Sequence, residues 1–171
     1  MSILRIIYKK EGKASFISSN YIGKIFERAI RRLGIPLIFS QGYTRKLKIS
    51  LGPPLAVGVI GMNEVIDVHT ADSEISVIEI RKKLNGFLPE GLAAMECRYL
   101  RQDEKSPPEI KVARYTVRVT DCITSAIPDN WQVLSQKDDT ADIVIPLDKF
   151  KHKDLFSCFG TENVIKRVLI F

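Results

Sequence analysis

Basic side chains in the first third of the sequence are the residues best suited to chemistry with an anionic ligand. Four of them recur at helical spacing: Lys24, Arg28, Arg31 and Arg32. An arginine guanidinium holds phosphate through two parallel N–H donors, and a cluster of cations gains affinity for polyanions by releasing counterions. A solvated helix face that serves only solubility has the same pattern, so these four residues by themselves leave both interpretations open.

A second group of polar and basic residues follows closely. Its members are Ser40, Gln41, Tyr43, Arg45, Lys46 and Lys48. A tyrosine beside two cations allows a nucleobase to stack while phosphates meet the charges. The alternative interpretation is a hairpin loop whose Tyr43 packs on a sheet.

The distribution of charge favours an anionic partner for both groups. Residues 1–55 hold eleven Lys and Arg against two Glu, a net charge of +9. Residues 56–103 have a net charge of −3, and residues 104–171 are neutral overall. Because the excess positive charge of the chain, +6 in total, is concentrated at its beginning, the sequence predicts a surface there that attracts anions.

Other chemistries find little support in the residues. His69 and His152 have no evident partner to orient them as a general base, so we interpret them as structural or exposed. The sequence has no Cys-x-x-Cys pair, and we therefore expect no metal, no iron–sulfur site and no cofactor held by this chain. The stretch from Gly52 to Gly58 lacks the spacing of a phosphate-binding P-loop and predicts a rigid turn. We predict no catalytic residue.

Apolar periodicity predicts the two helices of the first hundred residues. Four apolar residues at spacings of four, four and three form one buried stripe: Ile22, Phe26, Ile30 and Leu33. This helix is predicted to start at Ser18 or Ser19 and to end before Gly34 and Pro36. A second helix is predicted from Asp72 or Ser73 to about Asn85, ended by Gly86.

Strands are predicted on both sides of each helix. Ile-rich or alternating segments that indicate strands occupy residues 3–8, 36–39, 46–51, 64–69 and 94–100. Apart from one additional short strand between the helices, this is the order strand–helix–strand–strand–helix–strand of the ferredoxin-like, split βαβ arrangement. We therefore predict an α+β fold with a basic, ferredoxin-like domain over residues 1–102.

The remainder of the chain predicts a smaller module after a linker at about residues 103–108. Strands are expected at residues 110–120, 131–134, 141–145 and 164–171, with a short helix at 150–159 stopped by Gly160. A weak helix at 122–127 would make residues 109–171 a second, shortened ferredoxin-like or α+β domain.

Composition predicts the compartment. No apolar run approaches the roughly 20 residues of a membrane span, and Arg5 comes too early for a signal peptide. Three widely spaced cysteines, Cys97, Cys122 and Cys158, argue against a disulfide framework and favour a reducing environment. We expect a cytoplasmic protein with no membrane partner.

Several motifs resemble one known family. Phe16-Ile17-Ser18 and the segments 26–36, 39–43, 48–50 and 54–58 follow one another in the order and spacing of the radical-SAM-linked domain family of unknown function. The resemblance covers about residues 1–100, and Glu64 matches an acidic position of the family. Members are typically fused to, or encoded beside, cobalamin-binding radical SAM proteins. The resemblance therefore implies a separate radical SAM protein as partner, because this chain has no Cys-x-x-x-Cys-x-x-Cys motif.

The sequence departs from that family at two places. Ser19 stands where the family has His, and Thr44, Arg45, Lys46 and Leu47 stand where it has Asn-Pro-His-Pro. If the family positions form a polar site, this chain has basic charge there in place of imidazoles.

Three functions fit these features. The favoured one is a non-catalytic accessory module that binds RNA or a nucleotide-bearing substrate and acts with a separate radical SAM protein. Its predicted contacts are the eleven residues Lys24, Arg28, Arg31, Arg32, Ser40, Gln41, Tyr43, Arg45, Lys46, Lys48 and Glu64. The first alternative is a protein-interaction subunit that docks on an acidic patch of its enzyme. The second is a small metal-independent RNA-processing enzyme that uses Tyr43, Ser40 or His69, for which no nucleophile–base pair is visible.

Overall fold

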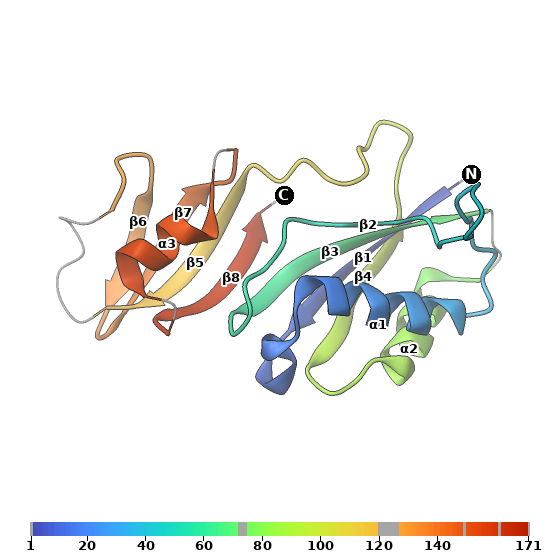
Figure 1. Ribbon diagram of the computed structural model, residues 1–171, viewed down its shortest axis with the longest axis horizontal. Helices are drawn as coiled ribbons and strands as arrows, with labels where there is room; N and C mark the ends of the chain where they lie inside the picture. Colours follow the sequence, from blue (N-terminus) through green and yellow to red (C-terminus); the bar gives the residue numbers. More distant parts are fainter. Residues whose placement is uncertain (1, 72–74, 120–126, 149, 161, 171) are drawn as a thin grey trace.

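A continuous β-sheet of eight strands runs the length of the protein (Figure 1). The computed structural model describes residues 2–71, 75–119, 127–148, 150–160 and 162–170. Within those ranges the fold is a mixed α+β arrangement of three α-helices, one 3-10 helix and this sheet. The α+β class expected from the sequence is confirmed.

The strand order of the sheet is β4–β1–β3–β8–β5–β7–β6, and β2 also pairs with β3. The strands are β1 (Ser2–Lys10), β2 (Ile49–Leu51), β3 (Ile60–Thr70), β4 (Leu92–Tyr99), β5 (Val112–Arg118), β6 (Gln132–Lys137), β7 (Thr140–Pro146) and β8 (Val164–Ile170). All the described pairings are antiparallel except that of β3 with β8, which is parallel. The β3–β8 pairing joins the strands of the first hundred residues to those of the last sixty.

Helix α1 (Ser19–Arg31) confirms the first predicted helix. Its stripe of Ile22, Phe26 and Ile30 is buried against the sheet. Gly34 follows with φ of 73°, a left-handed backbone conformation that costs glycine little and closes the helix. The 3-10 helix η1 (Gly12–Phe16) precedes α1.

Helix α2 (Val77–Phe87) begins later and ends later than its sequence predicted. The predicted caps at residues 72 and 73 lie outside the described residues. Ser76 caps the helix, since its Oγ accepts the backbone N–H of Glu79 at 3.2 Å. This Ser-x-x-Glu spacing is the capping-box signature. Gly86 remains within the helix, which ends at Phe87.

The segment between α1 and β3 contains less regular strand than predicted. The predicted strands at 36–39 and 46–51 reduce to two isolated bridges, Leu37 with Thr70 and Phe39 with Leu47, and to the three residues of β2. Pro36 has no N–H to donate. The Ile38 N–H donates to the His69 carbonyl at 3.0 Å, whereas the Lys48 N–H donates to the Ile38 carbonyl at 2.9 Å. Because these hydrogen bonds go to two different segments, a regular ladder forms only at β2.

The second half of the chain follows its predicted order of elements. Strands β5, β6, β7 and β8 occupy the predicted segments, with small differences at their ends. Helix α3 (His152–Phe159) starts two residues later than expected and stops at Gly160, whose φ is 79°. The weak helix predicted at 122–127 lies almost entirely outside the described residues.

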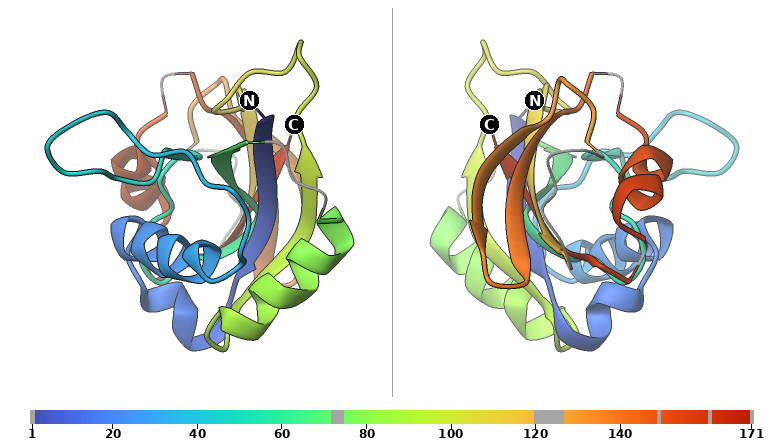
Figure 2. Two further views of the ribbon diagram at one scale, coloured as in Figure 1. Left: turned by 90° about the vertical axis from the view of Figure 1, so that its right-hand side faces the viewer. Right: turned by 90° about the vertical axis from the view of Figure 1, so that its left-hand side faces the viewer.

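Two hydrophobic clusters form the core. The first joins α1 and α2 to β1, β3 and β4, and the second joins α3 to β5, β7 and β8. Figures 1 and 2 show α1 and α3 on the same side of the sheet. The division into domains at 1–102 and 109–171 remains a prediction. Within the described ranges, no helix has the length and apolar character needed to cross a membrane.

Candidate nucleic-acid interface

The outward face of α1 carries the four cations that the helical spacing predicted. Lys24, Arg28, Arg31 and Arg32 are all exposed. Lys24, Arg28 and Arg31 lie on the face opposite the buried stripe and Arg32 lies on its flank, because a helix repeats every 3.6 residues. The span from residue 21 to residue 32 extends about 16 Å along the helix axis.

The segment of residues 40–48 forms a projecting loop on the same side of the molecule as α1 (Figure 2). Ser40 closes this loop through two hydrogen bonds to Lys46. The Ser40 N–H donates to the Lys46 carbonyl at 2.8 Å, and the Lys46 N–H donates to the Ser40 Oγ at 3.1 Å. Gln41, Tyr43 and Arg45 lie between these two residues and are exposed, and the Tyr43 ring is fully exposed.

Contacts between cations and aromatic rings connect the two groups. The Arg31 guanidinium lies 5.0 Å from the centroid of the Phe39 ring, at the base of the loop. Along the same helix, the Lys24 ammonium lies 5.9 Å from the centroid of Tyr21. Tyr21 is 55% exposed and Phe39 is 36% exposed, so both rings remain accessible.

We call this region the basic surface. It comprises Tyr21, Lys24, Arg28, Arg31, Arg32, Phe39, Ser40, Gln41, Tyr43, Arg45, Lys46 and Lys48. Arg31 pairs with Glu27 at 2.7 Å. In the part of the chain that the structure describes, the other six cations of this surface have no carboxylate within ion-pair distance. Their charge is therefore available to an external anion.

Glu64 lies apart from the other predicted contact residues. It is 2% exposed and forms a two-point ion pair with Arg167, with distances of 2.6 Å (Nη2 to Oε2) and 3.1 Å (Nε to Oε1). Arg167 is fully buried and also donates to the carbonyls of Pro53 at 2.8 Å and Pro54 at 2.9 Å. This pair links β3, β8 and the turn before β3, so the structure gives Glu64 a position inside the protein.

Two further ionisable groups lie beside the Glu64–Arg167 pair. Tyr8 pairs with Glu64 across β1 and β3, and burial, reinforced by the charge of Glu64, raises the pKa of its phenol. Lys10 is buried, donates to the carbonyl of Ile17 at 3.1 Å and has a pKa lowered by its burial. Sequence reasoning missed Tyr8, Lys10 and Arg167. No local signal distinguishes these residues, because Tyr8 is uncharged, Lys10 follows Lys9 and Arg167 follows Lys166.

Ser19 is one of the positions at which the sequence departs from the family described above, and its side chain bonds to the backbone of Leu55. Its Oγ donates to the Leu55 carbonyl and accepts the Leu55 N–H, both at 3.0 Å. It therefore fastens the start of α1 to the turn before β3. Thr44, at the other substituted place, is exposed on the projecting loop.

The described residues form neither a site for a histidine general base nor a metal site. His69 is half-buried in β3, and burial lowers its pKa. Among the described residues, no group of three or more His, Cys, Asp or Glu lies close enough together to hold a metal ion.

A mixed α+β protein with an accessible basic surface is therefore the class that this structure defines. A family model described as an uncharacterized protein conserved in bacteria (DUF2344) matches residues 4–154, and the chain belongs to this family. The match spans α1, the projecting loop and most of the second half of the chain. No curated protein matches the sequence.

Proposed function

We propose that this protein is a non-catalytic accessory module that binds RNA through the basic surface. The observation that carries this proposal is a set of cations that have no carboxylate partner among the described residues and that alternate with exposed aromatic rings over α1 and the projecting loop. Proteins that bind single strands combine these two features, because cations meet the phosphates and rings stack on the bases.

A salt titration tests the electrostatic part of the proposal. Binding of a fluorescently labelled single-stranded RNA is measured by anisotropy between about 50 and 200 mM salt. The logarithm of the affinity is expected to fall with the logarithm of salt concentration, with a slope of about −0.7 for each phosphate contact. Binding that does not depend on salt, or no binding at low salt, would rule the proposal out.

A pair of triple variants tests the location. Arg28→Gln, Arg45→Gln and Lys46→Gln together remove three cations of the basic surface. Lys82→Gln, Lys111→Gln and Lys137→Gln remove three exposed cations elsewhere and serve as the control, because the change in net charge is identical. We expect the first variant to lose most of the affinity and to show a shallower salt slope. An equal loss in both would show that binding follows net charge alone.

Substitutions of Tyr43 test whether an aromatic ring of the basic surface stacks on an RNA base. Stacking of one base on an aromatic ring contributes about 1–3 kcal/mol. We expect Tyr43→Ala to weaken RNA binding by about tenfold, whereas Tyr43→Phe, which keeps the ring, retains the affinity. A Tyr43→Phe variant as weak as Tyr43→Ala would exclude stacking.

We also propose that the module acts in the cytoplasm with a separate radical SAM protein. The support is the sequence resemblance at residues 16–18, 26–36, 39–43, 48–50 and 54–58. The test is co-purification with a radical SAM protein encoded nearby. If reversing the charge at Arg28 and Arg31 abolishes co-purification while the wild-type protein ignores RNA, the chain is a protein-docking subunit instead.

The finer assignment of the fold belongs with this proposal. We propose that the elements from β1 to β4 form a ferredoxin-like, split βαβ unit. Support comes from the antiparallel pairing of β1 with β3 and β4, and of β2 with β3. An experimental structure in which these elements superpose poorly on ferredoxin-like domains would refute it.

A further inference from the structure

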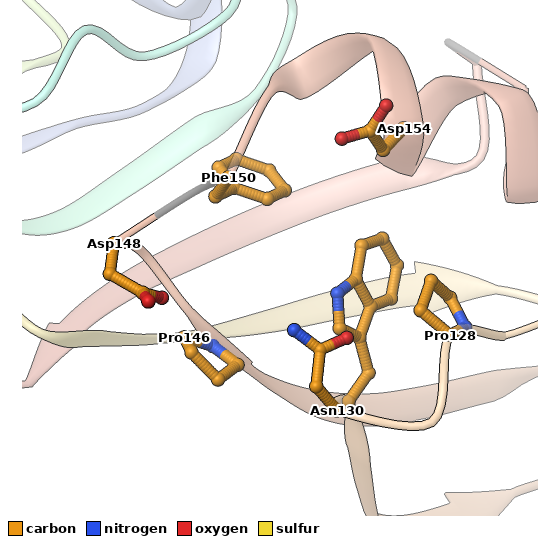
Figure 3. A pocket seen from close by; sticks show the side chains of 7 residues that line it. Pro128, Asn130, Pro146, Asp148, Phe150 and Asp154 are labelled. Carbon is orange, nitrogen blue, oxygen red and sulfur yellow. The ribbon is translucent and has the colours of Figure 1, made fainter.

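A cavity of about 150 Å³ lies at the start of α3, far from the basic surface in sequence. Its lining residues come from four segments: the turn before β6, the end of β7, the connection from β7 to α3, and the first turn of α3. They are Pro128, Asn130, Trp131, Pro146, Asp148, Phe150 and Asp154 (Figure 3). This volume corresponds to about five molecules of liquid water, so the cavity has room for one small functional group.

Two aromatic rings form the apolar part of the cavity. The ring centroids of Trp131 and Phe150 lie 6.2 Å apart, with the ring planes inclined by 55°. Trp131 is 9% exposed, so most of the indole is covered by protein. The Phe150 ring also packs against Tyr115 at 5.6 Å and against His152 at 5.1 Å, again between ring centroids. These contacts fix both rings before a ligand enters, which reduces the entropy lost on binding.

Two carboxylates form the charged part. Figure 3 shows Asp148 on one side of the Phe150 ring and Asp154 above the opposite side of the cavity. Across the described residues, neither carboxylate has an ion-pair partner, and none of the described residues that line the cavity is cationic. Burial, with the charge of Arg167, lowers the pKa of His152, so this neighbouring imidazole adds no positive charge at neutral pH.

We propose that this cavity binds a small organic cation of the trimethylammonium type. The faces of aromatic rings attract cations, and tryptophan does so most strongly. Carboxylates at the rim add attraction that a quaternary ammonium accepts without a directed hydrogen bond. A neutral group would gain no electrostatic attraction from the two exposed carboxylates, and an anion would be repelled by both. The site is independent of the basic surface and of its proposed RNA ligand.

The single tryptophan of the sequence provides a direct readout. The full-length protein is titrated with choline while the fluorescence of Trp131 is followed. A parallel titration uses 3,3-dimethylbutan-1-ol, which has the shape of choline but carries no charge. We expect a saturable change with choline in the millimolar range and none with the neutral alcohol. An equal response to both compounds, or no response to choline, would overturn the proposal.

Three variants locate the charge dependence. Asp154→Asn and Asp148→Asn keep the shape of the lining but remove one carboxylate each. Asp129→Asn is the matched control, because Asp129 is an exposed neighbour that does not line the cavity. We expect about a fivefold or larger loss of choline affinity in each of the first two, and less than about a twofold loss in the control. Unchanged affinity in both lining variants would refute the site, provided that their thermal unfolding matches the wild type.

Discussion

Arginine has two opposite environments in this protein, and the comparison between them separates ligand binding from folding. Arg28 on α1 is exposed and has no carboxylate within ion-pair distance among the described residues. Arg167 in β8 is fully buried and bonds to Glu64 and to two carbonyls. Arg5 in β1 resembles Arg167, with two 2.8 Å bonds to the carboxylate of Asp67.

The difference lies in what removal of a partner leaves behind. An exposed charge is solvated whether or not a ligand is present, so its loss changes the unfolding free energy little. A buried ion loses several kcal/mol of solvation free energy, which its partner offsets. Removal of that partner therefore leaves an uncompensated charge inside the protein. The same residue type therefore serves binding on α1 and internal positioning in the strands.

Removal of Arg167 should have the largest effect on stability. Arg167→Ala leaves the Glu64 carboxylate buried without its partner, and we expect the free energy of unfolding to fall by about 3–5 kcal/mol. Urea denaturation measures this change. The double variant Glu64→Ala/Arg167→Ala should be more stable than Arg167→Ala alone, because it also removes the Glu64 carboxylate that Arg167→Ala leaves buried without its partner. A loss below about 1 kcal/mol for Arg167→Ala would break the comparison.

Removal of Asp67 should have the next largest effect. Arg5 remains buried in Asp67→Ala but keeps its 2.8 Å hydrogen bond to the Lys105 carbonyl. We therefore expect a loss of about 3 kcal/mol, near the lower end of the range for a broken buried pair. Thermal and urea unfolding should agree on this value. A loss as small as that of a surface substitution would mean that water reaches Arg5.

Removal of the uncharged Ser19 side chain should have an effect on stability between those of the buried and the exposed arginines. Ser19→Ala removes both hydrogen bonds to Leu55, and we expect a loss of about 1–2 kcal/mol. Ser18→Ala is the control, since the Ser18 side chain makes no capping hydrogen bond to the helix. Its expected loss is below about 0.5 kcal/mol. The reverse order of the two losses would show that Ser18 is the effective cap.

Arg28 should show the smallest effect. We expect Arg28→Gln to change the unfolding free energy by less than about 0.5 kcal/mol, because the side chain is exposed. Differential scanning calorimetry beside the wild-type protein measures the change. A loss above about 1.5 kcal/mol would reveal a contact of Arg28 that stabilises the fold and would weaken its assignment to ligand binding.

Local patterns in the sequence were sufficient to predict most helices and strands. The stripe of Ile22, Phe26 and Ile30 predicted α1, and alternation around Ile66 and Val68 predicted β3. These patterns are local because side chains alternate or recur along one helix or strand at a fixed period. The burial of residues 64–68 on both faces of β3 was not part of the pattern. The position of the basic residues on α1 followed from the same period, although their use by RNA remains a prediction.

Only the tertiary structure decided which charges are buried and which segments meet. Glu64 and Arg167 are about a hundred residues apart, and no local pattern pairs them. The parallel contact of β3 with β8, and the cavity built from Trp131, Phe150 and Asp154, likewise join separate segments. Such contacts depend on how whole faces pack, which the sequence period of any single element leaves open.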